Sequence, residues 1–337
     1  MEIFSNFSLK KYNTFVIEAK AKEFVSVQNI EELQTILQEY INKPKFILGG
    51  GSNMLLTKDI DALVIHVDLK GKSIIKEDED FVWIESKAGE NWHEFVIWCI
   101  NQNFGGIENM SLIPGNVGTT PIQNIGAYGA EIKDTFEYCN AININNFEKK
   151  KFYKDDCKFG YRESIFKQEL KEQFIITSVV FKLTKRNYKL NTSYGDIIKE
   201  LEKENVIFPT LKDVSNAIIN IRKSKLPDPK VLGNSGSFFK NPIVSKDEFD
   251  KIISSNPEMP HYILSDSKIK IPAGWLIEKA GFKGKRFGDA GIHKNQALVL
   301  VNYGTASGQE ILNVSNDIQN TIFNQFGITI EAEVNII

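Results

Sequence analysis

The chain has 337 residues, of which 42% are hydrophobic and 25% are charged, and these fractions exclude a disordered, collagen-like or disulfide-scaffold protein. The 41 Lys and Arg residues nearly balance the 43 Asp and Glu residues, so we expect no broadly basic surface for nucleic acid. Any anionic ligand must therefore be held by a local cluster of donors.

The first predicted unit covers about residues 12–68 and alternates strands with a helix. Apolar residues in the segment 29–40 have helical spacing, and Asn29 is placed to cap the N-terminus of that helix. The segments 45–48 (KFIL) and 62–67 (ALVIHV) are predicted to be buried strands. Between these strands, the sequence GGGSN predicts a glycine turn directly at a strand end.

A second predicted unit begins near residue 80 and combines one helix with several strands. The helix covers NWHEFVIWCIN, in which the apolar residues lie on one side. A long stretch from Gly105 to Gly129 is too rich in Gly, Asn and Pro to form one regular element. Strands are predicted for FVWIES, EYCNAININ and residues 174–183 (FIITSVVFKL).

The last predicted unit follows a polar connection, KRNYKLNTSYGD. It contains helices over 213–225 (DVSNAIINIRKSK) and 308–326 (GQEILNVSNDIQNTIFNQF), and a final strand over 328–337 (ITIEAEVNII). The order of elements predicts an α/β to α+β fold with a boundary near residues 190–210.

Cys99, Cys139 and Cys157 show no CxxC or Cys/His spacing, so we expect packing residues and no metal site. The first residues, MEIFSNFSLKKYNTF, lack the continuous apolar core of a signal peptide. No run of 18 apolar residues is present to span a bilayer. We therefore expect a soluble cytoplasmic protein.

Two glycine-rich segments indicate a large nucleotide-like ligand. Residues 49–53 (GGGSN) and 113–120 (IPGNVGTT) permit close backbone approach, so successive amides in each can point into one concavity around a pyrophosphate. Neither segment matches G-x-G-x-x-G or GK[ST], which disfavours a Rossmann fingerprint and a P-loop. Either segment alone is equally typical of an ordinary turn, but together with 124–131 (NIGAYGAE) they favour ligand binding.

These segments closely resemble the FAD-binding region of the UDP-N-acetylenolpyruvoylglucosamine reductase (MurB) family. Further blocks follow in family order over nearly the whole chain, from about Asn13 to Val334. The blocks are SLIPGNVGTTPIQNIGAYGAEI, GYRESIFK, SYGD, KLPDP, GNSGSFFKNP, IPAGWLIEKAG and IEAEV. The block SYGD resembles the longer family subtype, which carries a tyrosine loop over the substrate.

The resemblance implies a vanillyl-alcohol-oxidase-type FAD-binding fold with two lobes and a separate α/β substrate-binding domain. On this basis we expect FAD-binding lobes over residues 1–68 and 69–190, and a substrate-binding domain over 205–337. The C-terminal strand would bring Glu333 to the active site.

The implied reaction is the NADPH-dependent reduction of UDP-GlcNAc-enolpyruvate to UDP-N-acetylmuramate in peptidoglycan precursor synthesis. Hydride from reduced FAD adds to the enolpyruvyl group, which leaves an enolate that needs charge stabilisation and then a proton. Arg162 in GYRES and Glu333 in IEAEV match the stabilising residues, and Ser237 in GNSGSFFKNP matches the proton donor.

The resemblance also implies the residues that contact each ligand. Those expected to contact FAD are Gly49, Gly50, Gly51, Ser52, Asn53, Pro114, Gly115, Val117, Gly118, Thr119, Gln123, Asn124, Gly126, Ala127 and Tyr128. Those expected to contact the UDP-sugar are Tyr194, Lys225, Asn241 and Gln296. No His or Cys occurs in 49–53 or 111–131, so we expect non-covalent FAD, in a monomeric enzyme.

Three of the proposed catalytic and substrate residues also have a purely structural interpretation. Ser237 follows Gly236 as a turn serine would, Arg162 has Glu163 beside it, and Lys225 ends a predicted helix, where a lysine complements the helix dipole. The four histidines, His66, His93, His261 and His293, form no cluster, and we interpret them as structural.

Near the catalytic glutamate the chain departs from many family members, because Ala332 and Asn335 replace a proline and an arginine.

Two other functions compete with the reductase: a different FAD oxidase or dehydrogenase on the same fold, and a sugar-nucleotide-binding protein without redox activity. The reductase and the other FAD oxidase or dehydrogenase predict a yellow protein, whereas the sugar-nucleotide-binding protein predicts a colourless one.

Overall fold

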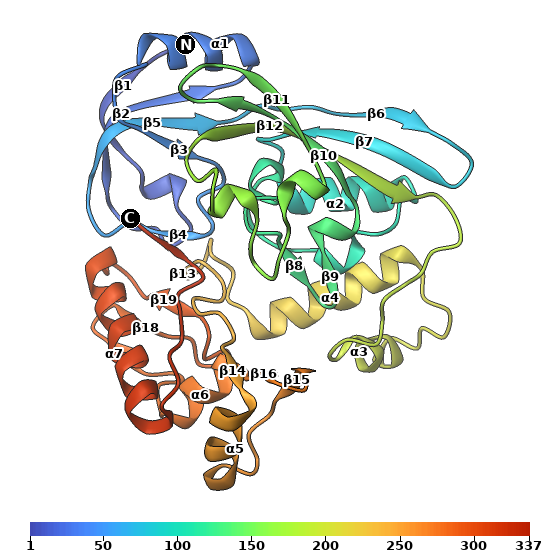
Figure 1. Ribbon diagram of the computed structural model, residues 1–337, viewed down its shortest axis with the longest axis vertical. Helices are drawn as coiled ribbons and strands as arrows, with labels where there is room; N and C mark the ends of the chain where they lie inside the picture. Colours follow the sequence, from blue (N-terminus) through green and yellow to red (C-terminus); the bar gives the residue numbers. More distant parts are fainter. The chain divides into compact units, whose positions relative to one another are not determined.

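The computed structural model describes all residues, 1–337, and the chain forms two compact units (Figure 1). Unit 1 contains residues 1–7, 21–50 and 60–224, and unit 2 contains 8–20, 51–59 and 225–337. The predicted α/β to α+β class is confirmed, because both units mix helices with strands. Segments 8–20 and 51–59 pack with the C-terminal third of the chain.

The first lobe of unit 1 is a four-stranded sheet with the strand order β1-β2-β5-β3. Strands β2, β5 and β3 run parallel, and helix α1 packs its apolar side against them. Asn29 caps α1 as predicted, because its side chain accepts a hydrogen bond from the Glu32 N–H at 2.8 Å. The elements are β1 (Phe4–Ser8), β2 (Lys20–Val27), α1 (Ile30–Glu39), β3 (Lys45–Leu48) and β5 (Ile60–Val67).

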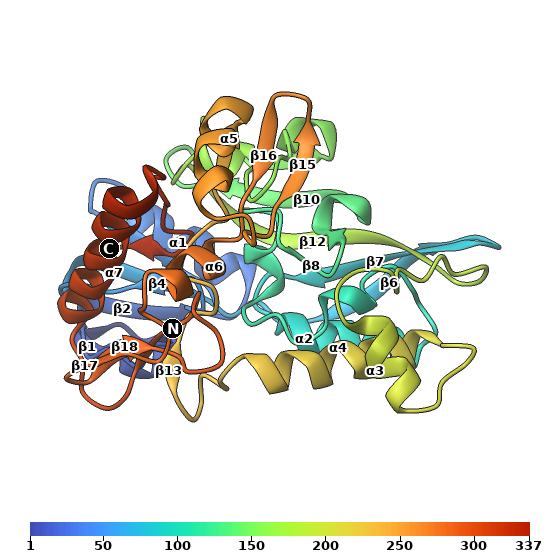
Figure 2. The ribbon, with the colours of Figure 1, turned by 90° about the horizontal axis from the view of Figure 1, so that it is seen from below.

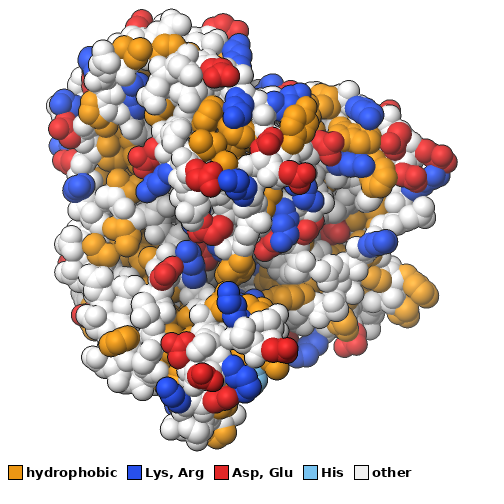
Figure 3. All heavy atoms as spheres, in the orientation of Figure 1, with side chains coloured by type: hydrophobic (Ala, Val, Ile, Leu, Met, Phe, Trp, Pro, Cys, Tyr) orange, Lys and Arg blue, Asp and Glu red, His pale blue; other side chains and the backbone are white.

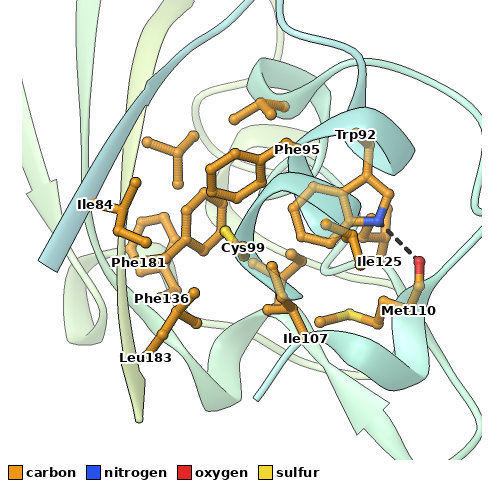
Figure 4. Packing of buried hydrophobic residues seen from close by; sticks show 14 of the residues in the cluster. Ile84, Trp92, Phe95, Cys99, Ile107, Met110, Ile125, Phe136, Phe181 and Leu183 are labelled. Carbon is orange, nitrogen blue, oxygen red and sulfur yellow. Dashed lines mark hydrogen bonds between the residues drawn. The ribbon is translucent and has the colours of Figure 1, made fainter. Parts of the chain in front are cut away.

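The second lobe of unit 1 is a five-stranded antiparallel sheet with the order β11-β10-β12-β7-β6. Helix α2 packs Trp92, Phe95 and Cys99 into a buried cluster that includes Phe181 of β12 (Figure 4). The elements are β6 (Lys72–Glu77), β7 (Phe81–Lys87), α2 (Trp92–Asn101), β10 (Phe136–Asn143), β11 (Lys149–Tyr153) and β12 (Phe174–Thr184).

Short elements connect these lobes to the long helix α4. The predicted irregular stretch 105–129 contains only 3₁₀ turns and half of a small hairpin, as expected from its Gly and Pro content. Helix α3 and helix α4 share a small apolar cluster, against which Tyr128 packs. The elements are β8 (Gly126–Ala127), β9 (Ala130–Glu131), α3 (Ile197–Lys203) and α4 (Leu211–Lys225).

Unit 2 is built on the antiparallel sheet β13-β19-β18-β17, with helix α7 packed on β18 and β19 (Figures 1 and 2). A second small sheet, β14-β16-β15, lies beside α5, and β4 pairs in parallel with β20. The strands are β4 (Met54–Leu55), β13 (Gly233–Asn234), β14 (Ile243–Ser245), β15 (Tyr262–Ser265), β16 (Lys268–Lys270), β17 (Arg286–Phe287), β18 (Ala290–Ile292), β19 (Leu300–Asn302) and β20 (Asn335–Ile336). The helices are α5 (Lys246–Ser255), α6 (Ala273–Lys279) and α7 (Gly308–Phe326).

The predicted C-terminal strand over 328–337 is largely wrong. Only β20 is a strand, and Ala332 forms an isolated bridge to Phe239. The segment alternates between several partners, because its backbone pairs first with residues 238–240 and then with β4. No helix of the chain combines the length and apolar character that crossing a bilayer requires.

The buried indole of Trp92 allows a test of how helix α2 holds the irregular stretch 105–129. Its Nε1–H donates to the carbonyl of Met110 at 3.0 Å, and the side chain is fully buried (Figure 4). Trp92→Phe leaves that carbonyl without its donor and opens a small cavity, so the free energy of unfolding should fall by about 2–3 kcal/mol. Urea denaturation measures this change.

Trp98→Phe is the matched control, because Trp98 lies on the same helix at the edge of the same cluster and is only partly buried. We expect a loss below about 1 kcal/mol for this variant. Equal losses in the two variants would contradict a specific role of the Trp92 hydrogen bond.

Candidate functional site

Gly49 and Gly50 of the first predicted glycine segment lie against the second segment in unit 1. We refer to residues 49–53 as the first glycine loop and to residues 111–120 as the second glycine loop. A Cβ on Gly50 would lie 2.8 Å from the Asn116 side-chain oxygen and 3.0 Å from the Gly115 Cα. A Cβ on Gly49 would lie 2.5 Å from the Thr119 methyl group. Only glycine permits this close approach of the two loops.

The second glycine loop is fixed to the second lobe by backbone hydrogen bonds. The Trp92 N–H donates to the Gly115 carbonyl at 3.0 Å, and the Gly118 N–H donates to the Ala88 carbonyl at 2.9 Å. A Cβ on Gly118 would overlap the Ala88 side chain, and Gly115 has a φ of 113°. The structure therefore requires glycine at both Gly115 and Gly118. An ordinary turn would not require glycine at both positions.

The hairpin β8–β9 continues from this loop and is held by Asn124. The Asn124 amide donates to the Gly160 carbonyl at 2.9 Å, and its side-chain oxygen accepts from the Lys133 N–H at 3.1 Å. Asn124 is fully buried with a φ of 46°, a left-handed conformation that asparagine tolerates. Its predicted role at the site is therefore accompanied by a structural one, because it joins the hairpin to the GYRES segment.

Arg162 in the GYRES segment reaches the same hairpin. Its Nη2 donates to the Gly126 carbonyl at 2.7 Å, and its backbone has a φ of 56°. The mutual backbone bonds between Gly160 and Glu163 form the tight turn that places Arg162 at this position. A guanidinium fixed beside a backbone hairpin is well suited to hold a planar anion, since its fork of donors is held in one orientation.

Arg222 on α4 is a further candidate that the sequence reasoning missed. Its Nε is buried and has no hydrogen-bond partner. Burial lowers the pKa of the Arg222 guanidinium more than the nearby Tyr128 raises it, and the neighbouring Arg162 adds a smaller lowering. A half-buried cation whose Nε lacks a hydrogen-bond partner is costly, so an anionic ligand group at this position would be stabilising.

Helix α4 is placed against the second glycine loop by a pair of buried serines. The Ser215 and Ser111 hydroxyl groups lie 2.8 Å apart, and both side chains are nearly inaccessible to solvent. Arg222 follows Ser215 by two helical turns, so the two residues lie on one face of α4. This periodicity is the only sequence signal that could have associated Arg222 with the loop.

Tyr194 in the SYGD block lies over the same hairpin and is about half exposed. Its ring packs edge-on against Tyr128 with the centroids 6.4 Å apart. Asn109 supports this arrangement, because its amide donates to the carbonyls of Tyr128 and Asn191, each at 2.8 Å. Lys225 is exposed at the last position of α4. This position agrees with the structural interpretation of Lys225 as a lysine at a helix end.

Unit 2 places Ser237 and Glu333 on adjacent backbone segments. The Glu333 N–H donates to the Phe238 carbonyl at 2.8 Å, and the Phe238 N–H donates to the Leu298 carbonyl at 2.7 Å. Phe238 is fully buried, whereas Ser237 is exposed. Gly236, with a φ of 71°, turns the chain just before the serine. The structure thus brings two of the predicted catalytic residues together through their backbones.

Asn53 of the first glycine loop is bound to the Glu333 segment. Its side-chain amide donates to the Glu333 carbonyl at 3.3 Å, and the Asn335 side chain donates back to the Asn53 carbonyl at 2.8 Å. Asn335 is one of the two departures from the family pattern. Its amide takes a structural role, and Ala332 pairs with Phe239 through the backbone alone.

Asn241 and Gln296 both lie at the N-terminus of α6. The Asn241 side-chain oxygen accepts a hydrogen bond from the Ala273 N–H at 2.9 Å. A Cβ on Gly274 would lie 3.5 Å from the Gln296 side-chain oxygen. These two predicted substrate contacts are therefore neighbours in space, although 55 positions separate them in the sequence numbering.

The remaining predicted cofactor residues belong to the same loops. A Cβ on Gly51 would overlap the Tyr12 carbonyl oxygen, and Val117 is fully buried, so both have packing roles. The others are half-buried or exposed and lie along the two loops and the hairpin: Ser52, Pro114, Gln123 and Ala127.

The three cysteines are buried and free, and burial raises the pKa of the Cys99 thiol well above its ordinary value.

Charges on the surface of the chain are mixed. Figure 3 shows Lys and Arg side chains interspersed with Asp and Glu side chains over the visible face. This distribution agrees with the net charge of -2.

Comparisons with known proteins agree with this geometry. A family model described as the C-terminal domain of UDP-N-acetylenolpyruvoylglucosamine reductase matches residues 228–337. A model described as an FAD binding domain matches residues 21–145, which include both glycine loops. The cofactor indicated for the loops is therefore FAD.

Two full-length relatives are both described as UDP-N-acetylenolpyruvoylglucosamine reductase. The protein of Flavobacterium johnsoniae is 73% identical over 337 residues, which cover 100% of each chain. The protein of Pseudomonas putida is 45% identical over 331 residues, which cover 98% of this chain and 97% of its own. The crystal structure of MurB from Thermus caldophilus has the same fold, with a TM-score of 0.69 at 23% identity over 99% of this chain and 98% of its own.

The contact between Gly118 and Ala88 tests whether the second glycine loop holds FAD. In Gly118→Ala the added methyl group overlaps Ala88, so the loop amides must move away from the lobe. Overpacking of this kind costs about 1–3 kcal/mol, and FAD affinity should fall by about 10-fold or more. Titration of the apoprotein with FAD, followed by flavin fluorescence, measures the affinity.

Gly160→Ala is the control, because a Cβ there would make only an ordinary contact, 3.4 Å from the Glu163 Cβ. Circular dichroism verifies that both apoproteins are folded. Wild-type FAD affinity in Gly118→Ala would contradict the assignment of this loop to the cofactor.

Proposed function

The chain belongs to the UDP-N-acetylenolpyruvoylglucosamine reductase family, and we propose that it reduces UDP-GlcNAc-enolpyruvate to UDP-N-acetylmuramate with NADPH. This reaction produces a peptidoglycan precursor. The structural observation that carries the proposal is the backbone pairing that places exposed Ser237 beside the Glu333 segment. A sugar-nucleotide-binding protein without redox activity would need neither residue.

FAD fits the residues that the structure provides. Gly49, Gly50 and Gly118 permit the close backbone approach that the loops need, and Arg222 offers a positive charge whose buried Nε has no hydrogen-bond partner. When bound, FAD would supply the redox chemistry that connects NADPH with the enolpyruvyl double bond. The chain supplies the binding surface, the orientation and the local charge.

Two residues would stabilise the negative charge that develops on the enolpyruvyl group. Arg162 is held by its hydrogen bond to the Gly126 carbonyl, and its guanidinium would lie beside the substrate carboxylate. Glu333 would assist the enolate if it carries a proton, because a neutral carboxyl group donates a hydrogen bond. The enolate is thereby stabilised before it is protonated.

Ser237 would give the proton to the α-carbon. A serine hydroxyl is a weak acid in water, but a carbanion-like carbon is a strong base, so the transfer is chemically reasonable. The position of Ser237 supports this role, because it is exposed between a left-handed glycine and two buried phenylalanines. The surrounding backbone fixes the serine while its hydroxyl remains accessible.

The UDP-sugar would be held by residues of different elements. Lys225 would bind the diphosphate and Tyr194 would cover it, while Asn241 and Gln296 contact the sugar or nucleotide from the start of α6. This assignment keeps the division into FAD-binding lobes over 1–68 and 69–190 and a substrate-binding domain over 205–337. The enzyme would act as a cytoplasmic monomer, because NADPH and UDP-sugars are cytoplasmic and every proposed role falls on one chain.

We expect FAD to be bound non-covalently, because the glycine loops contain no His or Cys that could attach to it. Acid precipitation of the purified yellow protein should release all the flavin into the supernatant, where its absorbance is measured. Yellow colour that stays in the denatured pellet would identify a covalent bond.

The role of Ser237 separates the two halves of the reaction. In Ser237→Ala, NADPH should bleach the flavin absorbance at the wild-type rate, because that half needs no proton on the substrate. Return of the colour after addition of UDP-GlcNAc-enolpyruvate should slow by about 10²–10⁴, the usual contribution of a general acid. Stopped-flow absorbance measures both rates.

Ser237→Cys is the matched variant, since its thiol can donate a proton from nearly the same position, and it should recover part of the rate. Wild-type return of colour in Ser237→Ala would show that Ser237 is only a turn residue. Failure of the wild-type protein to oxidise NADPH in the presence of the substrate would refute the proposed reaction itself.

A further inference from the structure

His93 lies at the start of α2, and its ring is bonded to the backbone of the second glycine loop. The Leu112 N–H donates to His93 Nδ1 at 3.0 Å. Because Nδ1 accepts this bond, its lone pair must be free and the ring proton must be on Nε2. The bond therefore requires a neutral imidazole in one tautomer. Nothing in the spacing of the four histidines indicated this contact.

Leu112 is the residue at which the loop changes direction. Its φ is 61°, a left-handed conformation that a leucine rarely adopts. Such conformations persist where the surrounding structure imposes them, and they concentrate at functional sites. Ser111 before it is held by Ser215, and Gly115 after it accepts from the Trp92 N–H. The His93 bond is the restraint on the strained residue between these two anchors.

We propose that neutral His93 is a positioning residue for FAD, which holds Leu112 in its left-handed conformation so that the following residues of the second glycine loop, 113–116, face the cofactor. The proposal rests on the proposed function, since it assumes that this loop binds FAD. His93 itself need not contact the cofactor. Its contribution is to the affinity for FAD, through the shape of the loop.

The surroundings of His93 favour its neutral form. Burial lowers the pKa of His93 from the ordinary 6.5, and the positive charges of Arg222 and Lys223 lower it further, whereas Glu94 opposes them. Protonation would turn Nδ1 into a donor facing the Leu112 N–H, so the bond would be lost and two donors would oppose each other. Affinity for FAD should therefore be complete above the His93 pKa and fall as the pH drops through it.

Asparagine and leucine provide a matched pair of substitutions at this position. The Asn Oδ1 occupies nearly the same place as His Nδ1 and accepts a hydrogen bond at every pH in this range. Leucine has the same branched shape as asparagine but no acceptor. A merely structural packing role for His93 would be affected equally by His93→Asn and His93→Leu.

The experiment measures the dissociation constant of FAD from wild type, His93→Asn and His93→Leu between about pH 5 and pH 8 by flavin fluorescence. We expect wild-type affinity to fall below about pH 6.5, since the pKa lies below that value. His93→Asn should bind like wild type at neutral pH, without the loss in acid. His93→Leu should bind about 10-fold more weakly throughout, because it leaves the Leu112 N–H unpaired.

Equal affinity of His93→Asn and His93→Leu, with normal FAD binding by wild type, would overturn this proposal and leave the proposed function intact. Failure of wild type to bind FAD would overturn both. Should His93→Leu not fold, ¹⁵N NMR of the wild-type imidazole decides the question. A proton on Nδ1 at neutral pH would refute the proposed bond, and a proton on Nε2 would support it.

Discussion

The organisation of unit 1 depends on keeping an irregular segment, the second glycine loop, rigid without the full set of internal hydrogen bonds that a helix or strand has. The loop is instead anchored from outside. Trp92 supplies an indole donor and a backbone donor, the Ala88 carbonyl accepts from the Gly118 N–H, and Ser215 reaches across from α4. The fully buried position of Trp92 makes these anchors part of the hydrophobic core (Figure 4).

The charges of the chain are mixed over the surface, and only a few positions can attract an anionic ligand. The net charge is only -2, and basic and acidic side chains alternate over the visible surface (Figure 3). We assign the attraction for an anion to Arg162 and Arg222. Burial lowers the pKa of the Arg222 guanidinium, and the neighbouring Arg162 lowers it by a smaller amount. Both arginines are half-buried, and the partial exclusion of water and counter-ions strengthens the effect of each charge on a ligand relative to a fully exposed site.

The sequence alone predicted the elements better than their partners. The helix over 308–326 agrees with α7 at both ends, because Ser307 and Glu310 form a capping box and Gly327 ends the helix in a left-handed conformation. The strand predicted over 328–337 failed, because an apolar pattern reports burial and not the strand to which a segment pairs. Arg222 and His93 were missed for the same reason. His93 is bonded to the Leu112 N–H and is influenced electrostatically by Arg222, and no local pattern encodes these relations between distant segments.

The pairing around Ser237 shows how support and chemistry are kept apart in unit 2. The Glu333 N–H and C=O are both used, one by the Phe238 carbonyl and the other by the Asn53 amide, so the backbone of the glutamate is fixed from two sides. Ser237 is fixed through Phe238, whose ring is fully buried. Neither fixation uses the hydroxyl of the serine. The backbone contacts of the neighbouring residues set the position of Ser237, so its side chain can be replaced without changing the fold. Substitution of Ser237 therefore reports on proton transfer alone.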